Sequence, residues 1–413
     1  MIPFDELYHK MLEHSLVNNS TQNLPDGDKD QLDCLLHPEK HPLIWQTGNC
    51  NCMAERQQKC VSVCEFGAIT PQVEATGIAI DNDKCVGCHS CIDICESKKL
   101  TASKDILPTL EALRTHKGPV YALVAPAFSG QFGDDVSAGK LRKTLKLLGF
   151  AGMIEVALFA DILTLKEALE FDHNIKNETD YQLTSCCCPM WIAMIRRIYH
   201  QLLPNVPGAV SPMIACGRTV KILYPDAMTV FIGPCLAKKA EAKEIDVADA
   251  VDFVLTFQEL RDVFEVLKID PASQEEDNRD HSSRTGIIYA RAGGVSEAVK
   301  GTLEHLNPDR DITIRVQTAD GVPRCKAMIN DILAGKSHGN FFEGMGCVGG
   351  CVGGPKAIIK KEDGRVKVDE YGNNAQYATP IDNPYVIELL KKLGFTTVEE
   401  LLENSDIFTR QFN

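Results

Sequence analysis

Beyond about residue 104, short apolar runs alternate along the chain with amphipathic stretches. Val120–Val124 is an uninterrupted apolar run, which is typical of a strand buried on both faces. Ala138 to Leu148 repeats its apolar positions with a helical period and ends before Gly149. The same patterns predict further strands at 154–159, 229–232, 287–289 and 312–316, and further helices at 164–171, 191–203, 257–267, 295–305 and 324–334. This alternation predicts an α/β fold.

The chain before residue 104 follows a different pattern. Phe4–Leu16 is a short amphipathic stretch, followed by a polar run with the turn signal Pro25-Asp-Gly27. We interpret residues 1–44 as a loosely structured lead-in, in which Cys34 is a spare thiol. Residues 45–103 are rich in cysteine and lack long periodic segments, so a small domain there needs a metal to stabilise it. The predicted organisation is a lead-in at 1–44, a cysteine-rich domain at 45–103 and an α/β domain at 104–413.

Composition and charge narrow the classes of function. The chain has 413 residues, of which 17 are cysteine, and a formal net charge of −14. Cysteines clustered at short spacings favour metal binding over a disulfide framework, which belongs to small secreted domains. The negative charge argues against nucleic acid as a partner, because nucleic-acid binders carry basic surfaces. There is no secretory signal, and no apolar run approaches the ~20 residues that span a bilayer, so we expect a cytoplasmic protein with no membrane partner.

Four closely spaced cysteines lie in the second half of the cysteine-rich domain. The run Cys85-Val-Gly-Cys88-His-Ser-Cys91-Ile-Asp-Ile-Cys95 has the C-x2-C-x2-C-x3-C spacing of bacterial [4Fe–4S] ferredoxins. In that spacing the first three cysteines bind one cluster and the fourth binds its neighbour. The expected ligand sets are Cys64, Cys85, Cys88 and Cys91 for one cluster, and Cys50, Cys52, Cys60 and Cys95 for the other. Zinc is the less favoured alternative, because zinc sites usually use two C-x2-C pairs.

Three later segments carry further cysteines. They read Thr184-Ser-Cys-Cys-Cys-Pro-Met-Trp191, Gly233-Pro-Cys-Leu-Ala-Lys-Lys-Ala-Glu241 and Glu343-Gly-Met-Gly-Cys-Val-Gly-Gly-Cys-Val-Gly-Gly-Pro355. We expect each to lie at the end of a strand and to lead into a helix or a glycine-rich loop, and open α/β sheets gather ligands at such places. No single segment could surround a metal cluster. Together they offer the four thiolates of one more cluster, on Cys188, Cys235, Cys347 and Cys351.

With the cysteine array, these segments resemble the signature of the [FeFe]-hydrogenases, over about residues 45–360. The resemblance implies an N-terminal bacterial-ferredoxin-like domain with two [4Fe–4S] clusters, followed by a two-lobed α/β catalytic domain. It also implies an H-cluster, in which Cys351 bridges a [4Fe–4S] cluster to a two-iron subsite with carbon monoxide, cyanide and azadithiolate. Lys238 then matches the lysine that holds a cyanide ligand, and Met345 a methionine that packs on the subsite. Residues matching the rest of the cofactor pocket are Ala125, Pro126, Ala127 and Pro234.

The resemblance further implies a proton relay at a cysteine. The triplet Cys186-Cys187-Cys188 has one cysteine more than the common pattern and resembles the minority subgroup called group B. Counting back from Pro189 makes Cys188 the cluster ligand and Cys187 the relay, because the proline starts the helix. Counting forward from Thr184 instead makes Cys187 the ligand.

Two glutamates match the rest of the usual proton path. Glu167 and Glu170 stand three residues apart and therefore share one face of a predicted helix. Two solvated helix glutamates are the alternative, which is serious for Glu170 and weaker for Glu167. The serine that usually links them falls, on a rough count, near Pro207, which cannot carry a proton. A different path through Cys186 is the alternative.

The resemblance therefore implies an enzyme, a hydrogen:ferredoxin oxidoreductase that interconverts protons, electrons and H2. The expected partners are a ferredoxin-type one-electron carrier and the maturation machinery that builds the two-iron subsite. One alternative is an H2-sensing or regulatory relative with slow turnover, although no sensor or kinase segment is recognised. The other is an iron–sulfur assembly or scaffold relative without the two-iron subsite, against which Lys238, Met345 and the relay-type cysteine argue.

Overall fold

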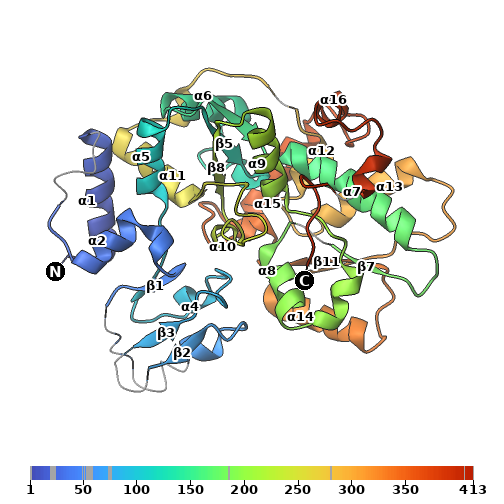
Figure 1. Ribbon diagram of the computed structural model, residues 1–413, viewed down its shortest axis with the longest axis horizontal. Helices are drawn as coiled ribbons and strands as arrows, with labels where there is room; N and C mark the ends of the chain where they lie inside the picture. Colours follow the sequence, from blue (N-terminus) through green and yellow to red (C-terminus); the bar gives the residue numbers. More distant parts are fainter. Residues whose placement is uncertain are drawn as a thin grey trace.

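A computed structural model of the protein describes residues 2–18, 25–48, 50, 52, 59–72, 77–184, 187–279, 281–403 and 405–412 (Figure 1). Its largest sheet has four parallel strands in the order β6-β5-β8-β9. The strands are β5 (Val120–Val124), β6 (Gly152–Glu155), β8 (Met228–Gly233) and β9 (Phe253–Thr256). Most of their side chains are buried, as expected for a parallel sheet covered on both faces.

Helices pack around this sheet, namely α5 (Ile106–Thr115), α6 (Ala138–Leu147), α9 (Pro212–Leu223) and α11 (Phe257–Leu267). The start of α11 is set by a capping box between Thr256 and Glu259. The Glu259 N–H donates to Thr256 Oγ1 at 3.2 Å, and the Thr256 N–H donates to the Glu259 carboxylate at 2.8 Å. The helix ends at Lys268, which adopts a left-handed backbone conformation.

A second, smaller parallel sheet has the order β10-β11-β7. Its strands are β7 (Gln182–Leu183), β10 (Val316–Asp320) and β11 (Phe341–Met345), and the helices around it are α8 (Pro189–Arg197), α13 (Gly294–Leu306) and α14 (Val322–Leu333). The long helix α7 (Ala157–Asn174) contacts α9 of the first lobe and α13 of the second (Figure 1). This helix therefore connects two α/β lobes.

The cysteine-rich part is built from two antiparallel strand pairs. β1 (Ile44–Gln46) pairs with β4 (Leu100–Ala102), and β2 (Ile69–Pro71) pairs with β3 (Ile78–Ile80). The short helix α4 (Ser90–Asp93) contacts β4. Leu236, which follows Cys235 in the first lobe, belongs to the apolar cluster of this part, so the cysteine-rich part packs directly against the lobe.

Further helices are α10 (Ala237–Glu241), α12 (Arg284–Ile288), α15 (Lys361–Asn373) and α16 (Pro384–Lys392). Short 3-10 turns lie at Pro38–Lys40, Pro126–Phe128, His200–Asn205, Pro271–Ser273, Cys351–Gly353 and Glu399–Leu402. Among the described residues, no helix has the length and apolar character needed to cross a bilayer.

The interpretation of residues 1–44 as loosely structured is wrong for two stretches. α1 (Phe4–Val17) and α2 (Lys29–Leu36) are helices, and α1 packs into the main core. Tyr8 is buried, and its hydroxyl donates to Asp262 of α11 at 2.9 Å. The amphipathic pattern of the first stretch was the correct signal, because its apolar face has a partner. Part of the polar run, residues 19–24, lies outside the described residues.

Several other elements differ from their predicted bounds. The strand expected at 154–159 ends at Glu155, and α7 begins at Ala157. Residues 287–289 close the helix α12 instead of forming a strand, and β10 begins only at Val316. The helix expected at 191–203 stops at Arg197 and is followed by a 3-10 turn. Short apolar runs do not distinguish a buried strand from a buried helix, which explains these errors. The α/β fold, the strands at 120–124 and 229–232 and the helices at 257–267, 295–305 and 324–334 are confirmed.

Candidate functional site

Cys188 lies immediately before α8. Pro189 is the first residue of that helix, in keeping with the preference of proline for this position. The N–H of Gly346, in the loop after β11, donates to Cys188 Sγ at 3.2 Å. This bond holds the first cysteine segment against the third. Cys187 is partly buried beside Cys188, and Cys186 lies outside the described residues.

Cys188 is one of four cysteines that the three segments bring together; the others are Cys235, Cys347 and Cys351. Burial and the neighbouring Cys188 raise the pKa of Cys235 to about 11. Burial, Cys235 and Cys188 raise the pKa of Cys351 to about 12. Burial and the other three thiols also raise the pKa of Cys347 well above its usual value. Because Coulomb effects weaken with distance, the four sulfur atoms must be neighbours.

This donor set suits an iron–sulfur cluster. Thiolates are the ligands of such clusters, and each of four thiolates binds a different iron atom, so they need not converge on one point. In the described part of the chain, no three candidate ligands converge closely enough for a single metal ion. Burial favours the neutral thiols, and bound iron would reverse that preference. Backbone N–H groups of Ala237 and Lys238 already favour the thiolate of Cys235 by hydrogen bonding to it.

Lys238 is a buried cation beside these cysteines. Its Nζ lies 2.6 Å from Oε2 of Glu241, and both side chains are almost fully buried. Burial lowers the pKa of Lys238, but Glu241 and then Cys235 and Cys187 raise it, and the net shift is upward. The ammonium group therefore pairs with a carboxylate and lies close enough to two thiols to interact with their charges.

Met345 is the last residue of β11. It is buried in an apolar cluster with Ala168 and Phe171 of α7, and Cys187 and Cys188 pack against the same cluster. The predicted relay cysteine, the methionine and the helix with the two glutamates therefore meet in one region.

Ala125, Pro126, Ala127 and Pro234 follow the carboxyl ends of the adjacent strands β5 and β8. The Ala125 N–H donates to Ile232 O at 2.9 Å, and a Cβ on Gly233 would lie 3.1 Å from that of Ala125. Ala127 is fully buried and offers no hydroxyl. Ligands of open α/β sheets bind at this edge, so the two segments can line a cofactor from the first lobe.

The glycine-rich loop around Cys351 packs on the backbone at Arg291. The Ala292 N–H donates to Gly349 O, and the Val352 N–H donates to Ala290 O, each at 2.9 Å. Gly350 has φ +83°, and a Cβ there would meet the backbone nitrogen of Ala292 at 2.5 Å, so only glycine fits. The guanidinium of Arg291 pairs with Glu297 and with Asp369, each at 2.5 Å. At Gly350 the close approach is therefore between two segments of the protein.

The two predicted proton-path glutamates lie on α7, and both are buried. Glu170 Oε1 pairs with Lys166 Nζ at 2.7 Å, and Lys166 also donates to Leu401 O at 3.0 Å. Burial raises the pKa of Glu170, and Lys166 opposes that shift. The interpretation of these residues as solvated helix glutamates is therefore wrong. The backbone oxygen of Glu167 accepts a hydrogen bond from Gln182.

The cysteine-rich part contains two further groups. Burial raises the pKa of Cys91, and so do Cys88, Cys85 and Cys64. Burial raises the pKa of Cys60, and so do Cys95, Cys50 and Cys52. The Ser97 hydroxyl lies 3.4 Å from Cys95 Sγ and 3.7 Å from Cys50 Sγ. These are the same two sets of four that the spacing predicts, and their role as ligands stays a prediction.

The three cysteine groups form a series. The outer group is Cys50, Cys52, Cys60 and Cys95, the middle group is Cys64, Cys85, Cys88 and Cys91, and the inner group is Cys188, Cys235, Cys347 and Cys351. Cys60 of the outer group contributes to the raised pKa of Cys91 in the middle group. Cys88 of the middle group contributes to that of Cys347 in the inner group. Cys88, Cys188, Cys235 and Cys347 also pack against one apolar cluster, centred on Val86 and Met190. Electron-transfer centres in these positions would lie next to one another.

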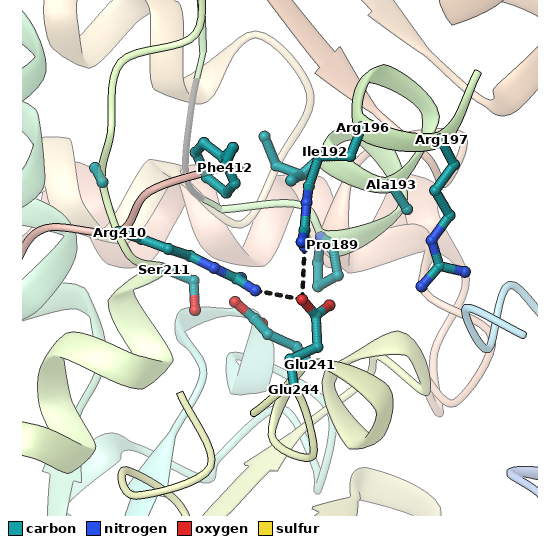
Figure 2. Close-up of a pocket in the computed structure, with 11 residues that line it drawn as sticks. Pro189, Ile192, Ala193, Arg196, Arg197, Ser211, Glu241, Glu244, Arg410 and Phe412 are labelled. Atoms are coloured by element: carbon teal, nitrogen blue, oxygen red, sulfur yellow. Dashed lines mark hydrogen bonds and ion pairs between the residues drawn. The ribbon is translucent and has the colours of Figure 1, made fainter. Parts of the chain in front are cut away.

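Glu241 also lines a surface pocket (Figure 2). Glu241 and Glu244 lie side by side there, and Oε2 of Glu244 accepts from Arg196 at 2.7 Å and also pairs with Arg410. The sequence analysis assigned no role to Glu241, although a carboxylate three residues after Lys238 on a helix was a usable signal.

Comparisons with known proteins agree with this arrangement. Residues 118–355 match the family described as "Iron only hydrogenase large subunit, C-terminal domain". The chain is 25% identical over 405 residues to the NADP-reducing hydrogenase subunit HndD of Solidesulfovibrio fructosivorans, covering 83% of this chain and 69% of that protein. It is 22% identical over 371 residues to the nuclear prelamin A recognition factor of Xenopus laevis, covering 73% of this chain and 81% of that protein.

Among solved structures, a variant of [FeFe]-hydrogenase HydA1 from Chlamydomonas reinhardtii has a TM-score of 0.59 at 20% identity. The likeness covers 74% of this chain and 98% of that chain, and it shows a shared fold. The family match covers more than half of the chain and includes all four cysteines of the inner group. The chain therefore belongs to the iron-only hydrogenase large-subunit family.

Proposed function

We propose that this protein is an [FeFe]-hydrogenase that interconverts two protons, two electrons and H2 at an H-cluster. The observation that carries the proposal is the convergence of Cys188, Cys235, Cys347 and Cys351 from three segments of the matched family region. These four thiols would hold the [4Fe–4S] part, and Cys351 would bridge it to the two-iron subsite. The H-cluster, when bound, supplies the iron chemistry that interconverts protons and H2.

Lys238 would hold an anionic ligand of the two-iron subsite. A buried ammonium is stable only among anions or hydrogen-bond acceptors, and Glu241 occupies one side of Lys238. Cys235 and Cys187 lie on the side that faces the cluster, where a cyanide could bind. Met345, Ala125, Pro126, Ala127 and Pro234 would line the rest of the pocket.

Electrons would pass through two accessory [4Fe–4S] clusters, held by the outer and middle cysteine groups. The electrostatic influence of Cys60 on Cys91 and of Cys88 on Cys347 supports this order, because each pair links one cysteine group to the next. A ferredoxin-type carrier would exchange electrons at the outer group. The proposal includes a cytoplasmic location, a group B-like enzyme and maturation machinery that inserts the two-iron subsite.

Protons would reach the site through Cys187, with Glu167 and Glu170 behind it. A thiol with an ordinary pKa of about 8.5 can exchange protons near neutral pH. The packing of Cys187 against the same cluster as Ala168 and Phe171 supports this role, since those residues neighbour the two glutamates on α7.

An iron–sulfur assembly or scaffold protein without the two-iron subsite is the second candidate, favoured by the likeness to the nuclear prelamin A recognition factor. The two candidates differ in whether Lys238 and Met345 would contact a two-iron subsite. A scaffold has no need of a buried cation beside the inner cysteines, whereas a cyanide-bearing subsite does.

Infrared spectroscopy of the matured protein, combined with H2 evolution from a reduced one-electron donor, tests the proposal. A hydrogenase shows absorption bands of iron-bound carbon monoxide and cyanide together with H2 production. A scaffold contains iron and sulfide but shows neither.

A further inference from the structure

Two consecutive helices, α12 and α13, lack a side-chain cap of their own. The side chain of Ser283, the N-cap residue of α12, accepts no capping bond, and the N-cap residue of α13 is Gly293, which has no side chain. The first N–H groups of a helix have no partner within the helix and need one from elsewhere. In both helices a buried carboxylate from a distant part of the chain supplies it.

Glu343, on β11, caps α13. Its Oε1 accepts from the Gly293 N–H at 2.7 Å, and its Oε2 accepts from the Ser296 N–H at 2.8 Å and from the Ser296 hydroxyl. Only 1% of Glu343 is exposed. Burial raises the pKa of Glu343, and the bonds from Ser296 and Gly293 oppose that shift. A carboxylate is also favoured at this place because the N-terminus of a helix carries a partial positive charge.

Asp161, on α7, caps α12 in the same way. Its carboxylate accepts from the N–H groups of Ser283 at 2.7 Å and of Gly286 at 2.8 Å, and from Thr285 Oγ1 at 3.0 Å. Asp161 is fully buried, and burial raises its pKa to about 6 against these bonds. The two helices α12 and α7 lie so close that a Cβ on Gly286 would come within 2.1 Å of Ala157 O.

The turn between the two helices, residues 289–293, is therefore fixed at both ends. It is also tight, since a Cβ on Gly294 would lie 1.8 Å from Ile288 O, and Gly293 has φ +79°. Burying a carboxylate is costly, and a polar side chain at the N-cap position would cap either helix without that cost. What the buried carboxylates add is a tie from the turn to α7 and to β11.

The loop that carries Cys351 packs on this turn. The Ala292 N–H donates to Gly349 O, and the Val352 N–H donates to Ala290 O, each at 2.9 Å. The two bonds lie on either side of Cys351 in the loop, and Val352 follows that cysteine directly. The position of Cys351 therefore depends on the position of the turn.

We propose that Glu343 and Asp161 form a clamp on the turn 289–293, and that this clamp holds the Cys351 loop in its cluster-binding shape before a cluster is bound. Both are positioning residues, because they act through the turn and not by contact with the cluster. A preformed site does not bear the entropic cost of ordering its ligands, so it retains a cluster longer. The inference rests on the proposed function, because that function has the inner cysteine group hold a [4Fe–4S] cluster.

Three variants test the clamp. Glu343→Gln and Asp161→Asn keep the shape of each side chain, but an amide nitrogen cannot accept a hydrogen bond, so each variant loses the bonds made by one oxygen. Ser296→Ala is milder, because it removes one hydroxyl donor and leaves both backbone bonds to Glu343 in place. This variant keeps the test open if the other two do not fold.

Glu155→Gln is the matched control. Glu155 is also a buried carboxylate on a parallel strand, the last residue of β6. It accepts from Arg142 Nη2 at 3.0 Å and from the Tyr371 hydroxyl at 2.6 Å. Those partners belong to α6 and α15, so the variant loses bonds of a buried carboxylate without loosening the caps of α12 and α13.

The first readout is amide hydrogen exchange in the cluster-free, full-length protein, measured at the same interval below the melting temperature of each variant. The amides of Val352 and Ala292 report the two bonds between loop and turn. They should exchange at least about tenfold faster in Glu343→Gln and in Asp161→Asn, because the turn opens locally more often. Ser296→Ala should show a smaller increase, and the control should match the wild type.

The second readout is the electron paramagnetic resonance spectrum of the reduced inner [4Fe–4S] cluster, in protein without the two-iron subsite. In Glu343→Gln this signal should broaden, because the thiolate of Cys351 adopts more than one geometry, and an iron chelator should remove the inner cluster several-fold faster. The signals of the outer and middle clusters should stay unchanged, since their ligands lie outside the loop.

Wild-type exchange at Val352, or a wild-type signal of the inner cluster in Glu343→Gln, would overturn the clamp and leave the proposed function standing. Equal changes in Glu343→Gln and Glu155→Gln would also overturn it, because they would show only a general loss of stability. Faster exchange in Glu343→Gln, combined with a matured wild type that lacks infrared bands and H2 production, would contradict the proposed function instead. The two failures are therefore distinguishable.

Discussion

Lys238 Nζ and Glu241 Oε2 lie 2.6 Å apart on α10, buried between the inner cysteines and the surface pocket. The lysine faces the thiols of Cys235 and Cys187, and the glutamate faces the pocket that holds Arg410 (Figure 2). A buried cation next to a metal-cluster site is thus held in place by an anion supplied one helical turn away.

Removing only one partner of this pair should destabilise the protein. Glu241→Leu leaves a buried ammonium without its carboxylate, which costs about 3–5 kcal/mol, and the double variant with Lys238→Met should regain most of that loss. Thermal unfolding of the cluster-free protein measures both. Glu388→Leu is the control, because its pair with Lys392 is largely exposed and should matter little. Equal melting of Glu241→Leu and the control would refute a structural role for the pair.

Low pH should weaken the ion pair between Glu297 and Arg291, whose backbone packs against the Cys351 loop. Burial opposes ionisation of Glu297, but hydrogen bonds from Arg291 and Arg284 lower its pKa below the usual 4.5. A lowered pKa gives stability that is complete above the unfolded value and is lost as pH falls through the folded one. Glu297→Gln should therefore melt below the wild type at pH 7, and the gap should close below about pH 4.5. A gap that is constant from pH 7 to pH 3 would contradict this assignment.

Removing a cysteine of the middle group should leave the cluster of the inner group intact. Cys85→Ala should remove one accessory cluster and slow electron supply from a ferredoxin, while the infrared bands of the H-cluster persist, because the ligand sets are separate. Iron analysis and infrared spectroscopy measure the two effects. Cys216→Ala is the control, since Cys216 is fully buried in α9 outside all three groups. Unchanged iron content in Cys85→Ala would show that this group binds no cluster.

The cysteine triplet gives opposite outcomes for its last two members. Cys187→Ala should keep the cluster and turn over H2 about 10²–10⁴ times more slowly, because a proton relay is lost. Cys188→Ala should lose the inner [4Fe–4S] cluster, because one iron loses its thiolate. Iron content and H2 evolution distinguish the variants. Exchanged phenotypes would make Cys187 the ligand, and inactivity confined to Cys186→Ala would move the proton path to that residue.

How far sequence predicts this fold depends on local signals. The helical period of its apolar residues predicts α11 to the residue, and the structure shows that a capping box of Thr256 and Glu259 fixes its start. The strand expected at 287–289 is a helix end, because a three-residue apolar run carries no period. α1 was taken for a lead-in because its partner Asp262 lies far away in the sequence.

The residues of the candidate site also differ in whether a local signal in the sequence predicts them. Cysteine spacing predicts the two groups of the cysteine-rich part, and three separate segments supply the third group. The structure places the members of each group near one another, and their role as ligands stays a prediction. The pairing of Lys238 with Glu241 was readable from helical spacing but was not used. The setting of Glu170 depends on a residue far away in the sequence, because its partner Lys166 also donates to Leu401 O.

The central claim is that Cys351 joins a [4Fe–4S] cluster to a two-iron subsite. Infrared spectra of the matured wild type and of Cys351→Ala test it most directly, since carbon monoxide and cyanide on iron absorb where protein does not. The account predicts these bands, with H2 evolution, in the wild type and loss of both in Cys351→Ala. A wild type without the bands, or Cys351→Ala with bands of wild-type intensity, would contradict it.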